Sequence, residues 1–325
     1  MGQETIRHAA CCRGEPPGAM YYLHGATTHY HLSFIVKAIL LQIIGKERAH
    51  SSHRLRSRCR EQGNLEAGVS CAIMMKRKEL IVYLLWCFGL TWACDGIVIL
   101  NAHFEFFPNF IISIIKVLGS LAPTISVVIL LKKYGAIGSR KNIFQFIFDF
   151  PKRVLPYAIL LAFLLWRFLV FWFSGETAQA QPLYMIFPIL LVQLLIQGGF
   201  EEPGWRGFLQ PYFEKKYPLI ISILLVSIIW SVWHIPLWFV PGSTQSQMSF
   251  LIFFLQIIVN TCSLAAILKF TKSVVFCMIY HAWCNAIFLV IPFEMNIGII
   301  AAYAFEAVVS LVLCLIYNKR KRIAA

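Results

Sequence analysis

From residue 80 onward, long apolar runs alternate with short polar connections. A helix of about 20 apolar residues is long enough to cross the hydrocarbon core of a bilayer. By that measure eight segments have spanning length, with the approximate bounds 80–100, 108–131, 154–173, 183–202, 218–240, 249–268, 273–291 and 297–317. The pattern predicts an all-α polytopic membrane protein, a bundle of about eight transmembrane helices.

The basic residues follow the same alternation. They fall in every second connection, at 76–78, 132–153, 215–216, 269–272 and 319–322. The connections between these, at 101–107, 174–182, 241–248 and 292–296, contain no Lys or Arg. Because basic connections stay on the cytoplasmic side, we expect an integral protein of the cell membrane with both termini in the cytoplasm.

Composition agrees with a lipid environment. The 325 residues are 59% hydrophobic and 14% charged, whereas an ordinary soluble domain is about 25% charged. The net charge of +14 would favour a nucleic-acid partner in a soluble chain, but here topology accounts for it, so the expected partner is the bilayer and no nucleic acid. The ten cysteines form no CxxC pair, which argues against a disulfide framework or a thiolate zinc site.

Residues 1–73 differ from the rest of the chain, being polar and rich in His and Arg. Their one apolar run, 34–44, is too short to span a bilayer. Our hypothesis is that 1–73 form a mostly disordered N-terminal extension, arising from a misplaced translation start, and that 74–325 form the transmembrane domain.

The fourth apolar segment ends with ionisable residues. A carboxylate at hydrocarbon depth costs at least about 2.5–3.5 kcal/mol, so Glu201 and Glu202 are candidate site residues. Four positions separate Glu202 from Arg206, which places both on one helical face and favours an ion pair. If Arg206 neutralises Glu202, Glu201 is left as the carboxylate whose pKa can rise in an apolar setting until it works as a general base. Pro203 requires that the helix bend or restart nearby.

Two further segments carry polar residues. His234 lies in the fifth, and the four-residue spacing of His281 and Asn285 puts them on one face of the seventh. Such groups suit hydrolysis, with a base to activate water and donors for an oxyanion. Two His and one Glu also suit zinc. Arg167, inside the third segment, either pairs with a carboxylate or faces a polar cavity.

Three short motifs thus stand in order on separate predicted helices: Glu201-Glu202-x-x-x-Arg206, an aromatic residue, Trp230, four positions before His234, and His281-x-x-x-Asn285. In this order they resemble the CPBP family, which comprises CAAX prenyl endopeptidases and bacteriocin-processing or immunity proteins and is also called the Abi family. The resemblance covers roughly residues 75–320. Trp230 stands where the family usually has Phe.

The resemblance implies a role for each motif residue: Glu201 and His234 activate the hydrolytic water, Glu202 and Arg206 orient the site, and His281 and Asn285 stabilise the oxyanion. The family is described both as glutamate-dependent and as metal-dependent. The sequence leaves open whether zinc is bound; a metal would take Glu201, His234 and His281. His-Glu-x-x-His, Gly-x-Ser-x-Gly and Gly-x-Gly-Asp are absent, which argues against other protease classes.

The predicted function is that of an intramembrane endopeptidase that cuts a peptide or membrane-protein substrate near the cytoplasmic leaflet. One alternative is a non-catalytic peptide-binding or immunity protein of the same fold, and a second is an ion- or proton-coupled transporter.

One geometric conflict remains in the predicted helices. Glu201 falls near the cytoplasmic end of its helix, whereas His234 lies some 16 residues, about 24 Å, into the next one. The two residues can meet if the fourth helix continues past Pro203 toward residue 208, or if the fifth helix begins well outside the hydrocarbon. We favour a combination of the two.

Overall fold

A computed structural model of the chain describes residues 75–137, 139–174, 181–291 and 295–323, and throughout this part the regular elements are helices. The hypothetical extension 1–73 lies outside the described residues. The longer helices are α4 (Arg77–Phe104), α5 (Asn109–Ser120), α6 (Ala122–Lys133), α8 (Val154–Ser174), α9 (Ile186–Leu195), α12 (Leu219–Trp233), α13 (Phe250–Thr271), α14 (Val274–Val290) and α15 (Ile297–Ile323). Shorter ones are α7 (Arg140–Ile147), α10 (Glu202–Gly204) and α11 (Gln210–Lys216).

The all-α polytopic prediction is confirmed, although the exact count of eight spans is not. In the described part, six helical stretches are long and apolar enough to cross a membrane: Arg77–Phe104, Val154–Ser174, Leu183–Lys216, Leu219–Phe239, Phe250–Thr271 and Ile297–Arg320. Helices α5 and α6, bent by 50° at their junction, make a seventh when taken as one broken span. The remaining predicted segment is α14, whose 17 residues span only about 26 Å.

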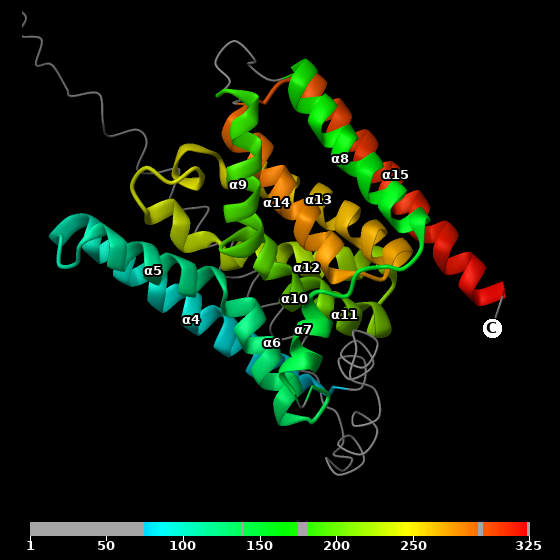
Figure 1. Cartoon of the computed structure of the whole chain (residues 1–325), viewed down its shortest axis with the longest axis horizontal. Helices are drawn as coiled ribbons and strands as arrows, with labels where there is room; N and C mark the ends of the chain where they lie inside the picture. The colour runs from blue at the N-terminus through cyan, green and yellow to red at the C-terminus, as the bar shows by residue number, and fades with distance from the viewer. Residues whose placement is uncertain (1–74, 138, 175–180, 292–294, 324–325) are drawn as a thin grey trace, which may run out of the picture. The chain divides into compact units, whose positions relative to one another are not determined.

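Helix α14 is the central element of the bundle. It packs against α8, α9, α10 and α13, and most of its side chains are buried among its neighbours. Figure 1 shows α14 between α9 and α13, with α8 and α15 along one edge of the bundle and α4 and α5 at another. A helix surrounded by protein in this way does not have to match the full thickness of the hydrocarbon.

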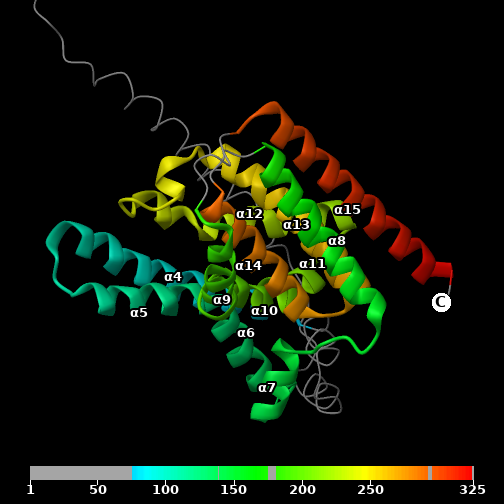
Figure 2. The same cartoon turned by 45° about the horizontal axis from the view of Figure 1, so that its top comes forward.

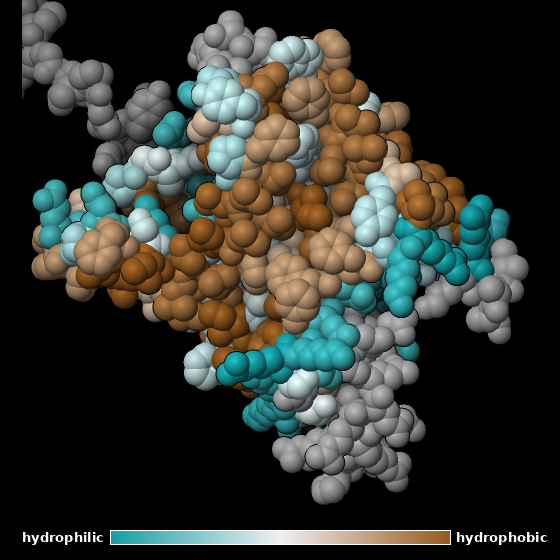
Figure 3. All heavy atoms as spheres, viewed as in Figure 1, coloured by the Kyte–Doolittle hydropathy of each residue, from teal (hydrophilic) through white to brown (hydrophobic). Residues whose placement is uncertain are grey.

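The outer surface has the character expected of a protein in lipid. Large apolar side chains such as Val154, Phe173, Phe187 and Ile297 are exposed. Figure 3 shows apolar side chains over most of one face, with hydrophilic ones gathered toward its margins. A soluble monomer rarely exposes apolar patches beyond a few hundred Å², so the pattern indicates a surface that hydrocarbon covers.

The fourth apolar segment is interrupted, and this corrects its prediction as one helix over 183–202. Helix α9 ends at Leu195, and the backbone of Gln197 leaves the helical region with φ −125° and ψ −131°. The chain then restarts as a 3₁₀ turn, Gly198–Glu201, and remains helical through α10, a π-helical turn and α11 to Lys216. Pro203 stands in the first turn of the restarted helix, where a missing N–H costs no hydrogen bond.

Gly204 explains how the restarted helix packs against α6. A Cβ atom at this position would lie 2.6 Å from the Cβ and 2.7 Å from the backbone carbonyl of Pro123. Only a residue without a side chain therefore allows this approach. On the same side, the Thr124 hydroxyl donates a hydrogen bond to the backbone carbonyl of Phe200.

The restart resolves the conflict between Glu201 and His234. The turn between the two helical stretches is at Tyr217 and Pro218. Glu201 lies sixteen positions before Tyr217, and His234 lies sixteen positions after Pro218. Helices α11 and α12 pack together on either side of this turn. Because the two antiparallel stretches have equal length, Glu201 and His234 lie at the same distance from the turn and therefore next to each other. The fourth helical stretch thus continues past Pro203 as expected, and extends to Lys216 rather than ending near residue 208.

Candidate active site

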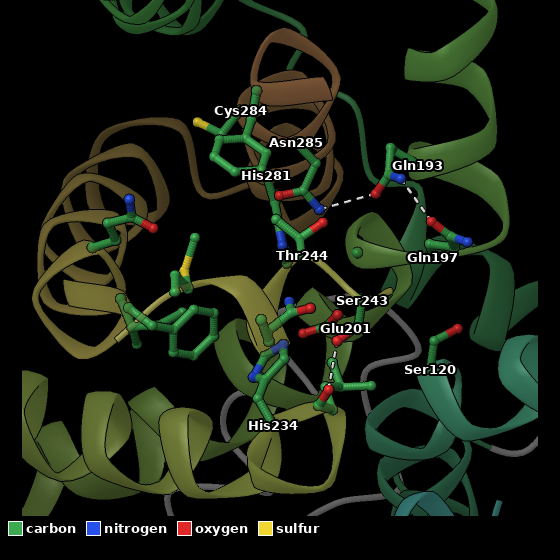
Figure 4. A pocket seen from close by; sticks show the side chains of 18 of the residues that line it. Ser120, Gln193, Gln197, Glu201, His234, Ser243, Thr244, His281, Cys284 and Asn285 are labelled. Carbon is green, nitrogen blue, oxygen red and sulfur yellow. Dashed lines mark hydrogen bonds between the residues drawn. The ribbon is translucent and has the colours of Figure 1, made fainter. Parts of the chain in front are cut away.

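One cavity of about 430 Å³ brings the predicted residues together. Its walls come from α4, α5, α8, α9, α12, α13, α14 and α15, together with the 3₁₀ turn and the segment 237–248. Four of the six predicted residues line it, and Figure 4 shows them around the same space: Glu201, His234, His281 and Asn285. Glu202 and Arg206 are fully buried in the wall behind.

The Glu201 carboxylate is held by two indole groups. Its Oε2 accepts hydrogen bonds from Nε1 of Trp230 at 2.8 Å and from Nε1 of Trp205 at 3.2 Å. No hydrogen bond to Oε1 is found among the described residues. Since an indole N–H can only donate, both bonds favour a carboxylate acceptor and fix Oε2. Oε1 is then the oxygen left for a molecule in the cavity.

His234 presents a basic nitrogen to the same cavity. Its Nδ1 lies 2.8 Å from the backbone carbonyl of Trp230. A carbonyl can only accept, so Nδ1 carries the hydrogen and Nε2 of the neutral ring is an acceptor. The ring stands at the end of α12, packed edge-on against Trp233 and Phe253. His234 is therefore oriented to receive a proton at Nε2.

Glu202 connects a cation and an imidazole. Nε of Arg206 lies 3.3 Å from its Oε2, the ion pair that the four-residue spacing predicts. Its Oε1 lies 2.8 Å from Nδ1 of His281, a contact that the sequence did not reveal. The Arg206 guanidinium also stacks over Trp230, with its Cζ 4.8 Å from the ring centroid. Glu202 thereby fixes the orientation of the His281 ring.

The polar atoms of His281 and Asn285 converge at Gly198. A Cβ atom on Gly198 would lie 2.9 Å from Nε2 of His281 and 2.5 Å from Nδ2 of Asn285. The glycine hydrogen leaves this space open, so two potential donors from α14 reach the backbone of the turn that carries Glu201. Such convergence is what stabilisation of a developing oxyanion requires.

Two glutamines complete this wall. Asn285 Nδ2 donates to Gln193 Oε1 at 2.9 Å, and Gln193 Nε2 donates to Gln197 Oε1 at 2.6 Å, as Figure 4 shows. Both glutamines line the cavity. Sequence reasoning missed them, although two amides four positions apart in an apolar segment carry the same signal that identified Glu202 and Arg206.

A second polar cluster borders the cavity at Arg167. Its Nη2 lies 2.8 Å from Oε1 of Glu306, and Nη2 also bonds Asn260 and Tyr280. Of the two expectations for Arg167, pairing with a carboxylate is therefore met, and the residue lines the cavity as well.

The predicted metal ligands Glu201, His234 and His281 are not gathered into a metal site in this structure. Within the part of the chain that the structure describes, no three His, Cys, Asp or Glu side chains are grouped so as to hold an ion. A metal would have to be held by Oε1 of Glu201 and by Nε2 of His234 and of His281, because Oε2 and both Nδ1 atoms are bonded elsewhere. Zinc sites need three or four ligands at about 2.0–2.3 Å.

Comparison with known proteins indicates a protease family. Residues 183–287 match the family model described as Type II CAAX prenyl endopeptidase Rce1-like. The chain thus carries an Rce1-like domain of the CPBP family. The matched range of this CPBP domain contains all six predicted site residues. The chain is also 29% identical, over 226 residues, to CAAX prenyl protease 2 of Methanococcus maripaludis, an alignment that covers 63% of this chain and 79% of the relative.

Proposed function

We propose that this CPBP protein is an intramembrane endopeptidase that hydrolyses a peptide bond in the cavity, within the bilayer. The observation that supports this most is Glu201. A carboxylate with one oxygen fixed by Trp205 and Trp230 borders a cavity shared with His234, His281 and Asn285. The family model and the archaeal relative, both named for CAAX prenyl proteolysis, support the same class of reaction.

In the first step, Glu201 activates a water molecule. Oε1 of Glu201 takes one proton as the water oxygen bonds to the scissile carbonyl carbon. Nε2 of His234, an acceptor in the neutral ring, holds the second hydrogen of the water and orients it. The carbonyl π bond breaks, and its electron pair becomes the oxyanion of a tetrahedral intermediate.

His281 and Asn285 stabilise this oxyanion. Asn285 donates through Nδ2 and His281 through Nε2, which requires that the ring carry both protons. The Glu202 carboxylate at Nδ1 balances the resulting charge, and Arg206 holds Glu202 in place. When the intermediate collapses, the C–N bond breaks and the leaving amine takes the proton from Glu201. All groups then return to their starting state.

A cleavage assay on the purified full chain tests this function. We expect wild-type protein to cut members of a peptide library with or without a chelator, and Glu201→Gln to lose at least about 100-fold in rate, the usual effect of a general base. Glu105→Gln, an exposed glutamate at the end of α4, is the matched control.

Each contrary outcome has a distinct meaning. If peptides bind but remain intact in both proteins, the chain is a non-catalytic peptide-binding protein. Substrate-driven proton flux in liposomes without cleavage would indicate a transporter. Loss of cleavage with chelator, restored by zinc, would contradict the glutamate-type mechanism.

A further inference from the structure

Residues 139–155, which contain α7 and the start of α8, carry an excess of positive charge. They include four basic residues and one acidic residue, Asp149, so their net charge is +3. Among the described residues, none of the four basic side chains forms an ion pair within 4.0 Å. Two of them begin α7 and two precede α8, and all four are exposed: Arg140, Lys141, Lys152 and Arg153. The segment therefore presents a positive surface that its own residues do not balance.

Large apolar side chains are exposed beside these charges. Phe144, on α7, is 62% exposed, and Phe150, Val154 and Leu155 are exposed as well. Figure 2 shows α7 at the far end of α6, with the chain continuing from it to α8. Because α8 is long and apolar enough to cross a membrane, its first residues mark the level at which hydrocarbon begins. Basic and apolar side chains thus meet at the level of the lipid headgroups.

This mixture of side chains favours one kind of partner. Water would leave the exposed rings uncovered, and neutral lipid would leave the basic side chains without counter-charges. Anionic phospholipid meets both needs, because its headgroup supplies negative charge and its chains cover apolar side chains. The basic connections are predicted to lie in the cytoplasm, and the cytoplasmic leaflet is the one with a negative surface potential.

The buried side of α7 packs on the restarted fourth helix. Phe146 is fully buried, and a Cβ atom at Gly207 would lie 2.7 Å from its Cζ. The ring of Phe148 meets that of Phe200 edge-on, with the centroids 6.0 Å apart. Phe200 and Gly207 flank residues 201–206, which include three of the six predicted site residues. Helix α7 therefore supports the backbone that holds them.

A second set of contacts joins the same segment to α14. The Ser273 hydroxyl, at the start of α14, donates a hydrogen bond of 2.8 Å to the backbone carbonyl of Asp149. The rings of Phe150 and Phe276 meet edge-on, with the centroids 6.4 Å apart. Helix α14 carries two further site residues. The segment thus lies between an exposed basic surface and both elements that supply the proposed base and the oxyanion donors.

We propose that residues 139–155 bind anionic phospholipid headgroups, and that this contact holds α7 against the elements that carry the site, so that hydrolysis is faster in an anionic leaflet. The side chains that contact lipid form the α7 surface: Arg140, Lys141, Phe144, Phe150, Lys152 and Arg153. The link to hydrolysis rests on the proposed function, whereas the lipid contact does not.

Helix α7 has little stability of its own. Arg140 and Lys141 occupy its first turn, where the helix dipole disfavours cations. A helix of eight residues is also too short to be stable in isolation. Headgroup phosphates offset the repulsion at this end, and hydrocarbon covers Phe144. The lipid contact therefore helps to keep α7 folded and packed on the site.

Photocrosslinking tests the lipid contact without turnover. The full chain is reconstituted in phosphatidylcholine nanodiscs that contain a trace of photoactivatable phosphatidylglycerol or photoactivatable phosphatidylcholine, and peptide mass spectrometry locates the crosslinks. We expect phosphatidylglycerol to label residues 139–155 more strongly than phosphatidylcholine does. The preference should be on the order of 5-fold for each basic side chain engaged, the effect of one such residue near an anionic surface.

Variants locate this preference. Arg140→Gln/Lys141→Gln should lower it, as should replacement by Gln of the two basic residues that precede α8. The charge-conserving exchange Arg140→Lys/Lys141→Arg should keep it. Lys319→Gln/Arg320→Gln is the matched control, because it removes the same charge from exposed positions near the end of α15. This control should retain the full preference within residues 139–155.

The same variants test the link to catalysis. Wild-type protein and the Lys319→Gln/Arg320→Gln control should cleave peptide faster in nanodiscs that contain phosphatidylglycerol than in phosphatidylcholine alone. The Gln variants of the α7 surface should cleave at the same rate in both, because they no longer attract the anionic lipid.

Two kinds of result would overturn the proposal. Equal labelling by the two lipids, as contact with neutral lipid or with a protein would give, or a preference that survives in the Gln variants, would contradict the lipid site. A rate increase with phosphatidylglycerol that survives in those variants would contradict its link to hydrolysis. Because crosslinking needs no cleavage, an inactive wild-type protein would contradict the proposed function without changing the labelling result.

Discussion

At the residue scale, Trp230 connects the parts of the site. Its indole N–H bonds Glu201, and its carbonyl accepts from His234. Its ring lies under the Arg206 guanidinium and edge-on to His281 at a centroid distance of 5.2 Å. One buried side chain therefore sets the positions of Glu201, the proposed general base, and of both histidines.

Replacing Trp230 by Phe tests this positioning role. The change keeps an aromatic ring but removes the 2.8 Å hydrogen bond to Glu201. A hydrogen bond to a charged group contributes about 1.5–3 kcal/mol, so we expect kcat to fall about 10- to 100-fold with little change in KM. Trp283→Phe, which removes an indole bond to the carbonyl of Leu164, neither residue being part of the cavity lining, is the control. A KM effect without a kcat effect would contradict the assignment.

Gly198→Ala tests the convergence of donors. The added methyl group would stand 2.5 Å from Nδ2 of Asn285 and 2.9 Å from Nε2 of His281, so one or both must move. We expect hydrolysis to be nearly abolished while thermal unfolding in detergent stays close to wild type. At Gly89 an added Cβ meets nothing within 4 Å, and Gly89→Ala should be fully active. An active Gly198→Ala protein would show that these donors are not required.

The sequence predicts only part of this residue-level site. Spacing within one helix was sufficient for Glu202 and Arg206, because neighbours four positions apart share a face. The bonds from Glu201 to Trp230 and from Glu202 to His281 join separate helices. The periodicity of a single segment cannot predict contacts between helices. The family resemblance implied the roles of the site residues but not the distances or hydrogen bonds between them.

At the element scale, the interrupted fourth segment decides where the site forms. Hydropathy indicated an apolar stretch but not the break at Gln197, because the mean over the whole stretch stays strongly apolar despite its glutamines and glycines. The break allows Glu201 to face a cavity instead of lipid. Irregular backbone at membrane depth is tolerated where it borders such a cavity.

The Arg167–Glu306 pair holds four helices together. Arg167 lies on α8 and Glu306 on α15, while Asn260 on α13 and Tyr280 on α14 bond the same guanidinium nitrogen. Removing one partner leaves an uncompensated buried charge, so Arg167→Met and Glu306→Leu should each destabilise the bundle by about 3–5 kcal/mol.

The double variant Arg167→Met/Glu306→Leu provides the comparison for this pair. It leaves no unpaired charge and should recover much of the loss, which thermal unfolding in detergent would measure. Additive destabilisation in the double variant would show that the two side chains do not act as a pair.

At the scale of the whole molecule, the expected fold class followed from hydropathy, but the number of spans did not. Helix α14 is short because protein surrounds it, and α5 and α6 divide one apolar segment at a 50° bend. Hydropathy records neither burial nor bending. Enclosure of α14 by the other helices is nevertheless what gives His281 and Asn285 a site shared with Glu201.

Charge alternation predicts the orientation of the bundle. We expect reporters fused after Lys78 and after Ala325 to be on the cytoplasmic side, because the basic clusters lie in every second connection. Fusions in the connection 241–248 should give the opposite signal. Terminal reporters on opposite sides would show an odd number of spans and contradict the predicted topology.

The central claim is that Glu201 activates a water molecule, whose oxygen bonds directly to the scissile carbonyl carbon. This claim is tested by a single-turnover reaction in H₂¹⁸O, in which the enzyme is in excess over a peptide that it is known to cut. Mass spectrometry of the product then shows which oxygen was incorporated. We predict one ¹⁸O atom in the new carboxyl group during the first turnover and no product from Glu201→Gln on the same timescale. An unlabelled product would show that a protein oxygen attacks the peptide, and undiminished cleavage by Glu201→Gln would show that another group activates the water.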